Sequence, residues 1–338
     1  MNKADRDKQL ADFVKGRNFV AYTNSYSIIN EGFIENFMDT VGYIIDNGES
    51  LNLQNPPATI YDQFNNLYAG DNNFCILKYH YGGWDLDTLK DFHAEYQKQI
   101  VGQDSALNRL MPNLYRMYKK RNKKPIIIML YGASGIGKTE TAKLISKTLE
   151  GKLMRKQLSM YQNNDAFDYL FGSSHSKGSF AKDLLEREAN IILLDEFDKA
   201  NEVFYSAFYQ LFDEGLFEDS NYRVEVGNSL IICTSNFKSE AEIRKAVGDP
   251  IYYRFDDLIY FEGLSTASIH IIIEKILDKE FEGLLPEEKE VISYKELLNV
   301  YKSNAERFMN FRHIEKIIKN DLYSRLVNEL VIKRDEIF

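Results

Sequence analysis

Residues Gly132–Thr139 read GASGIGKT, and the topology expected for the middle of the chain follows from this stretch. It fits the pattern GxxxxGK[ST], in which glycines let the backbone turn its N–H groups toward phosphate oxygens. Lys138 would place a charge on the outer phosphates, and Thr139 would offer a hydroxyl to Mg²⁺. The stretch predicts a phosphate-binding loop; a plain glycine-rich turn from a strand into a helix is the alternative.

The sequence on either side of the loop has the expected strand and helix patterns. Pro125–Tyr131 is an apolar run with β-branched residues, typical of a parallel strand buried on both faces, and a helical pattern follows over Lys138–Leu149. Asn190–Leu194 and Ser229–Cys233 resemble the first run, and helical stretches such as Phe204–Phe212 separate them. The pattern predicts an α/β fold with a parallel sheet and right-handed crossovers.

Two adjacent acids, Asp195 and Glu196, directly follow the second apolar run. Open α/β sheets bind ligands at the carboxyl ends of their strands, so both acids are candidates for the site. Asp195 would hold Mg²⁺, mostly through water, and Glu196 would orient and polarise an attacking water. The alternative is that the pair caps the next helix from its N-terminal side.

Further segments extend these motifs: residues 100–106 read IVGQDSA, 194–200 read LDEFDKA, 210–215 read QLFDEG and 234–236 read TSN. With them, the chain resembles the AAA+ ATPases of the Clp chaperone and unfoldase type over residues 98–262. The resemblance implies a P-loop NTPase core whose parallel sheet is flanked by helices and followed by a small helical lid. It also implies that Asn236, in the place of the family's sensor 1, positions the attacking water beside the γ-phosphate.

Two arginines extend the resemblance. Arg254, within the sequence YYRFD, matches the arginine finger that a neighbouring subunit supplies, which implies a ring. Arg312, within NFRHI, matches the sensor 2 arginine that opens a lid helix and reaches the nucleotide of its own subunit. Asn310 and Phe311 stand where the family has Gly-Ala. A solvated or salt-bridging role is the alternative for either arginine.

The resemblance therefore implies a site for ATP and Mg²⁺. Glu196, Asn236 and Arg254 are its predicted catalytic residues, and Thr139 and Asp195 its predicted metal ligands. The predicted nucleotide-binding residues, with Ile100 and Val101 lining the adenine pocket, are Ile100, Val101, Gly132, Gly135, Ile136, Gly137, Lys138, Thr139, Glu140 and Arg312.

The chain has 338 residues, and at about 150 residues per domain this length favours roughly two domains. We expect an N-terminal segment over residues 1–95, an α/β ATPase subdomain over 96–264 and a helical lid over 265–338. Residues 1–95 hold 14 acidic and 7 basic residues, so most of the net charge of −9 lies there.

The two ends of the chain carry mainly helical patterns. Apolar spacing over Ile28–Ile45 predicts one or two amphipathic helices, followed by a loop at Asn55–Pro57. After Phe261 the strand signal fades, and helical periodicity dominates from Asn304 to Ile332. The N-terminal segment is therefore expected to be mainly helical, and it contains no chemical motif.

Composition excludes several classes of protein. An acidic balance argues against indiscriminate coating of nucleic acid. Cys75 and Cys233 lie far apart, which excludes a disulfide framework and a cysteine metal cluster. The N-terminus lacks the apolar stretch of a signal peptide, and no apolar run approaches the roughly 20 residues that span a bilayer. We expect a cytoplasmic protein without a membrane partner.

Three features carry alternatives. Residues 170–180 replace the aromatic pore loop of Clp unfoldases with serines, His175 and Lys177, which would suit a polar or acidic partner or form a shortened solvent loop. The basic run Arg116–Lys124 could contact nucleic acid or be a solvated connection. Trp84 is interpreted as a core residue rather than a ligand platform.

The leading hypothesis is an ATP-hydrolysing, ring-forming remodeller of an unidentified protein partner, hexameric by family habit, which residues 1–95 could contact. A nucleotide-gated assembly module that recruits an effector is one alternative. A DNA-directed AAA+ loader or regulator is another.

Overall fold

The computed structural model describes residues 3–119, 124–161, 164–172 and 178–332. The chain divides into two compact units. The first comprises the described residues of Met1–Gly83, Lys120–Ile126 and Glu150–Ile231, and the second those of Trp84–Lys119, Ile127–Leu149 and Ile232–Phe338. The predicted boundaries at residues 95 and 264 stay predictions.

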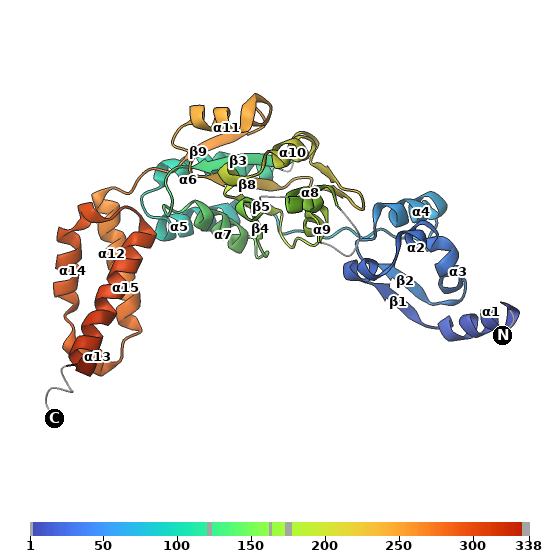
Figure 1. Cartoon of the computed structure of the whole chain (residues 1–338), viewed down its shortest axis with the longest axis horizontal. Helices are drawn as coiled ribbons and strands as arrows, with labels where there is room; N and C mark the ends of the chain where they lie inside the picture. Colours follow the sequence, from blue (N-terminus) through green and yellow to red (C-terminus); the bar gives the residue numbers. More distant parts are fainter. Residues whose placement is uncertain (1–2, 120–123, 162–163, 173–177, 333–338) are drawn as a thin grey trace. The chain divides into compact units, whose positions relative to one another are not determined.

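A parallel five-stranded sheet flanked by helices confirms the predicted fold class (Figure 1). Its strands, in spatial order, are β4 (Met154–Gln157), β5 (Ile191–Asp195), β8 (Leu230–Ser235), β3 (Ile126–Tyr131) and β9 (Asp257–Tyr260). Every residue of β3, β5 and β8 is buried. Because both faces are covered, these strands appear in the sequence as continuous apolar runs rather than alternating ones.

The N-terminal part of the first unit has a small core of its own. Its elements are α1 (Lys3–Val14), β1 (Asn18–Ala21), α2 (Glu31–Glu35), α3 (Phe37–Asn47), β2 (Ser50–Leu53) and α4 (Ala58–Tyr68). One or two helices are expected within Ile28–Ile45, and the structure has two, α2 and α3; Asn55, with φ of 45°, lies in the predicted loop. Sequence analysis did not predict β1 and β2, which pair in parallel. Five buried side chains form this core: Tyr26, Ile34, Phe37, Val41 and Ile60.

The rest of the first unit packs aromatic side chains against one another. It contains α8 (Asn164–Phe171), α9 (Phe180–Leu185), α10 (Glu202–Glu214) and the antiparallel pair β6 (Leu216–Glu218) and β7 (Arg223–Glu225). Phe180 contacts Phe208 at a centroid distance of 5.3 Å, and Phe208 contacts Phe204 at 5.7 Å. The Ala58 amide donates to the Asn221 carbonyl over 2.8 Å, which ties the N-terminal part to this layer.

The second unit contains α5 (Leu86–Gln99), α6 (Asp104–Tyr118), α7 (Lys138–Thr148) and α11 (Glu240–Tyr252). Trp84 is buried and packs edge-on against Phe92 at 5.8 Å between ring centroids, which confirms its interpretation as a core residue. Cys233 is buried in β8, and burial raises the pKa of its thiol; Cys75 is exposed, and both are free thiols.

The C-terminal part of the second unit is a helical bundle, as the periodicity predicted (Figure 1). Its helices are α12 (Thr266–Glu282), α13 (Pro286–Val291), α14 (Tyr294–Ser303) and α15 (Phe311–Val327), with a π-helical end at Asn328–Ile332. The core includes Ile273 and Leu277 of α12 and Ile314, Ile318 and Leu322 of α15. Throughout the described ranges, no helix is both long and apolar enough to span a bilayer.

Candidate nucleotide site

The predicted phosphate loop joins β3 to α7 in the second unit. Gly132, Gly135 and Gly137 have φ values of 133°, 74° and 111°. A Cβ on Gly132 would collide with the carbonyl oxygen of Phe261, and a Cβ on Gly137 would lie 3.0 Å from a side-chain carbon of Ile100. Both the backbone conformation and the close neighbours therefore require glycine.

Lys138, the first residue of α7, is buried at 7% exposure. Its ammonium donates to the carbonyl oxygens of Gly132 at 2.8 Å and Ala133 at 2.5 Å, and it approaches Oδ1 of Asn236 at 3.4 Å. Asn236 follows β8, so the structure brings together two residues predicted from separate motifs. The result is a positive charge enclosed by the loop, at a helix N-terminus that favours anions.

The predicted adenine residues lie beside this loop. Ile100 is buried against Gly137, and Val101 packs on the core of the helical bundle. Gln103 is buried, and its side-chain amide both donates to the Glu262 carbonyl at 2.9 Å and accepts from the Glu262 amide at 3.0 Å. These two hydrogen bonds join the segment after α5, which contains Gln103, to the segment after β9, which contains Glu262. Sequence analysis missed Gln103, whose only signal was a polar residue between Gly102 and a helix.

The first turn of α15 also contacts the phosphate loop. The Phe311 amide donates to the Gly135 carbonyl at 3.1 Å, and a Cβ on Gly135 would lie 3.1 Å from Cγ of Asn310. Oδ1 of Asn310 accepts from the His313 amide at 2.9 Å, so the residue that departs from the family's Gly-Ala acts as the helix cap. Arg312, which is exposed, lies in this same turn.

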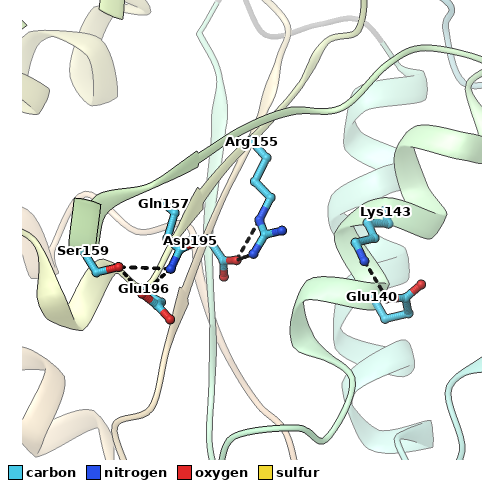
Figure 2. Close-up of polar contacts among 7 residues, drawn as sticks. All are labelled: Glu140, Lys143, Arg155, Gln157, Ser159, Asp195 and Glu196. Carbon is cyan, nitrogen blue, oxygen red and sulfur yellow. Dashed lines mark hydrogen bonds and ion pairs between the residues drawn. The ribbon is translucent and has the colours of Figure 1, made fainter. Parts of the chain in front are cut away.

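The two predicted acids lie in the first unit and have different partners (Figure 2). Asp195 ends β5 at 4% exposure, and its Oδ2 accepts from Nε of Arg155 at 2.9 Å and from Nη2 at 2.5 Å. Glu196 has a left-handed backbone with φ of 58°, and its Oε2 accepts from Gln157 at 3.0 Å and from the Ser159 hydroxyl.

The acidic pair does not cap α10. Glu196 occupies the N-terminal cap position of the short 3-10 helix Phe197–Lys199, but its side chain makes no capping hydrogen bond there. The cap of α10 is Asn201, whose side chain accepts from the Val203 amide at 3.1 Å. Arg155, Gln157 and Ser159 were not predicted as site residues. Arg155 and Gln157 are two positions apart in β4, so they share one face of the strand, and this alternation was the available signal.

The structure places the remaining predicted residues as follows. Ile136 is buried within the loop, Thr139 is the second residue of α7, and Glu140 forms an exposed ion pair with Lys143 at 3.1 Å (Figure 2). Arg254 follows α11, and its Nη1 donates to the Pro250 carbonyl. The roles of all these residues stay predictions.

The two remaining sequence features are described in part. Of the predicted pore segment, residues 173–177 lie outside the described residues, while Gly172 has φ of 77°. In the basic run, residues 120–123 lie outside them too. Arg116 pairs with Asp256 at 2.8 Å, and Lys119 lies over the rings of Tyr115 and Tyr118.

Comparison with known proteins agrees with this arrangement. The sequence model of the protein family described as AAA domain (Cdc48 subfamily) matches residues 123–288. Chaperone protein ClpB of Staphylococcus epidermidis is 31% identical over 214 residues, which are 53% of this chain and 25% of that protein. ClpB of Malacoplasma penetrans is 27% identical over 284 residues, which are 75% of this chain and 40% of that protein.

This chain carries a Clp-type AAA+ module. Among solved structures, a closed-state cryo-EM reconstruction of Hsp104 with ATPγS and FITC-casein aligns with a TM-score of 0.60 at 18% identity. The alignment covers 88% of this chain and 56% of the Hsp104 chain, and it extends the likeness of fold beyond the AAA+ module. The chain spans 25% to 40% of the length of the ClpB relatives cited above.

The pairing of Arg155 with Asp195 gives a stability prediction for the AAA+ module. Arg155→Met removes two hydrogen bonds from a cation to the buried Asp195 carboxylate, and we expect the free energy of unfolding to fall by about 1–3 kcal/mol. Urea unfolding followed by circular dichroism measures this. Lys152→Met, an exposed change just before the same strand, is the control and should stay within about 0.5 kcal/mol of the wild type. An unfolding midpoint equal to that of the control would contradict the pairing.

Proposed function

We propose that this chain binds ATP with Mg²⁺, hydrolyses the ATP, and does so within a ring of identical subunits that remodels a protein partner. The observation that carries the proposal is the enclosure of Lys138 by the phosphate loop together with its approach to Asn236. A buried ammonium at a helix N-terminus suits a polyphosphate better than any neutral ligand.

The residues around the loop fit a nucleotide. Positive φ at the glycines is typical of loops whose backbone N–H groups bind phosphate oxygens, and Lys138 adds the charge. Ile100 and Val101 offer an apolar surface for the base. Arg312 and Glu140 lie in the first turns of α15 and α7. Both are proposed to bind the nucleotide that is held by the phosphate loop of the same subunit.

The metal proposal uses Asp195 and Thr139. Among the described residues, no group of three or more His, Cys, Asp or Glu side chains could hold a metal ion. Mg²⁺ in nucleotide sites usually takes one or two protein ligands with phosphate oxygens and waters, and a buried carboxylate with a threonine hydroxyl suits that requirement. When bound, Mg²⁺ neutralises charge on the phosphate oxygens.

Glu196 is proposed to orient and polarise the attacking water, with Asn236 positioning that water. Gln157 and Ser159 are neutral donors to Oε2 of Glu196 and orient its carboxylate. Asp195, by contrast, is bonded to a cation. The two neighbouring carboxylates are thereby assigned to different tasks by their partners.

Arg254 is proposed to complete the site of a neighbouring subunit as an arginine finger, in a ring that is hexameric by family habit. The partner would be a protein, because the sequence relatives are named chaperones and the aligned Hsp104 reconstruction contains casein. The acidic N-terminal segment is the surface proposed to meet that partner, with basic character expected on the partner.

A second candidate function is a nucleotide-gated assembly module that recruits an effector. The sequence of residues 170–180 favours it, because no aromatic residue lies among the serines of the predicted pore segment, where Clp unfoldases hold a threaded chain. A DNA-directed role is favoured less, since Arg116, at the start of the basic run, is paired with Asp256 of the same chain at 2.8 Å.

Lys138→Ala should abolish nucleotide binding, because it removes the only charge that the loop itself supplies to the phosphates. A fluorescent ATP analogue titrated against each protein measures this. Lys147→Ala, an exposed lysine on the same helix, is the matched control and should bind like the wild type. Equal affinity for the Lys138 and Lys147 variants would contradict the site.

The ring proposal predicts complementation. Arg254→Ala should lower kcat for ATP by roughly 10³-fold or more, and Glu196→Gln by roughly 10²-fold or more. Mixed in equal amounts, they should regain activity at about a quarter of random interfaces, where an intact Glu196 meets an intact Arg254. Steady-state phosphate release measures this. No recovery on mixing, with both variants still assembling, would exclude a shared site.

A model unfolded protein separates the two candidate functions. Under the remodelling proposal, casein should raise the ATPase rate several-fold, because substrate engagement accelerates the cycle. Under the assembly proposal, ATP should change the oligomer size while casein leaves turnover unchanged. Parallel measurements of ATPase rate and sedimentation velocity distinguish these outcomes.

A further inference from the structure

The turn that carries Arg254 is separated from its helix by a kink. Within α11, Gly248 has φ of 76° and ψ of 158°, which is not helical, and the chain continues through Asp249 and Pro250 to Tyr252. The positive φ favours glycine at this position. Because the helical hydrogen bonding is interrupted, the orientation of the last turn depends on contacts that cross the kink.

Arg244 makes those contacts. Its Nε lies 2.6 Å from Oδ1 of Asp249 and its Nη2 lies 2.9 Å from Oδ2, a two-point contact between planar groups. The same guanidinium lies over the rings of Tyr252 and Tyr253, at 5.9 Å and 5.4 Å from their centroids. One side chain before the kink thus contacts three residues after it.

The chain on the other side of Arg254 is anchored to the sheet. The Asp256 amide donates to the Ile127 carbonyl at 2.7 Å, and the Ile127 amide donates to Oδ2 of Asp256 at 2.9 Å. Arg116 of α6 donates to Oδ1 of Asp256 at 2.8 Å. Arg254 therefore lies between a sheet anchor that follows it and the Arg244 contacts that precede it.

We propose that Arg244, together with Asp249, is a positioning residue that holds the Arg254 turn in the orientation needed to reach a second copy of this chain. The proposal rests on the proposed function of Arg254. An exposed ion pair adds little to global stability, so its use here is to restrain one turn. The Arg244 guanidinium also holds the pKa of the Asp249 carboxyl below its ordinary value, which keeps the pair charged at neutral and mildly acidic pH.

The first test compares Arg244→Met with Arg223→Met in the full chain. Arg223 belongs to another exposed pair, with Glu218 at 2.8 Å on the β6–β7 hairpin, and is the matched control. Arg244→Met should lower kcat for ATP by about 10- to 100-fold, the expected effect of a displaced catalytic group. KM for ATP and the melting temperature should stay at the control's values, because the site for the nucleotide and the core are untouched.

The second test measures the turn directly. The Tyr253 amide donates to the Asp249 carbonyl at 3.1 Å and the Arg254 amide to the Ile251 carbonyl at 3.0 Å. Hydrogen exchange of these two amides should be about tenfold faster in Arg244→Met than in Arg223→Met, since the restraint on the turn is lost. The charge reversal Arg244→Asp with Asp249→Arg should restore part of the lost kcat.

The outcomes separate the two proposals. If Arg254→Ala loses turnover while Arg244→Met matches the control in kcat and exchange, the positioning proposal is wrong and the finger stands. A further loss when Arg244→Met is added to Arg254→Ala would also overturn it, because a positioning residue acts only through Arg254. If Arg254→Ala itself turns over normally, the finger role is wrong, and faster exchange alone then shows only that Arg244 restrains the turn.

Discussion

The buried ammonium of Lys138 is the interaction on which the arrangement around the phosphate loop depends. A charge at this depth is costly unless hydrogen-bonded, and the loop supplies the carbonyl oxygens of Gly132 and Ala133. To bring those carbonyls inward, the backbone adopts positive φ at three glycines. Because glycine has no Cβ, Phe261, Ile100 and Asn310 can approach the loop closely. The loop thereby joins the end of β9, the segment after α5 and the first turn of α15 around one charge.

Sequence analysis predicted the strands in which every residue has the same buried environment. β3, β5 and β8 are buried along their whole length, so each appears in the sequence as a continuous apolar run. It could not predict β4, whose four residues Met154–Gln157 are mostly polar because two of them bond the acidic pair. β1 and β2 were missed because each has only four residues, with exposed positions along it.

The same contrast applies to the site. Glycines, Lys138 and the acidic pair are recognisable because their chemistry requires those residue types at fixed spacing. Arg155, Ser159 and Gln103 act through contacts between segments that are distant in sequence, and their local signals, such as the alternation of Arg155 with Gln157 in β4, do not distinguish them from other polar residues. A surface arginine and a functional arginine look alike in a sequence, and the role proposed for Arg244 depends on the kink at Gly248, which only the structure shows.

In the acidic pair, a change of backbone conformation at one residue, Glu196, gives two neighbouring carboxylates different hydrogen-bond partners. Asp195 keeps the strand conformation, so its carboxylate stays among buried neighbours and bonds Arg155 across to β4. Glu196 takes a left-handed conformation, which costs about 1–3 kcal/mol for a residue with a side chain. This conformation ends the extended path of β5 and directs the Glu196 carboxylate toward the neutral donors Gln157 and Ser159. An extended residue at this position would avoid the cost, but a strand places successive side chains on opposite faces of the sheet. The left-handed conformation therefore lets both acids bond residues on one face of β4, Arg155 and Gln157, and the proposal that Glu196 orients the attacking water depends on this placement.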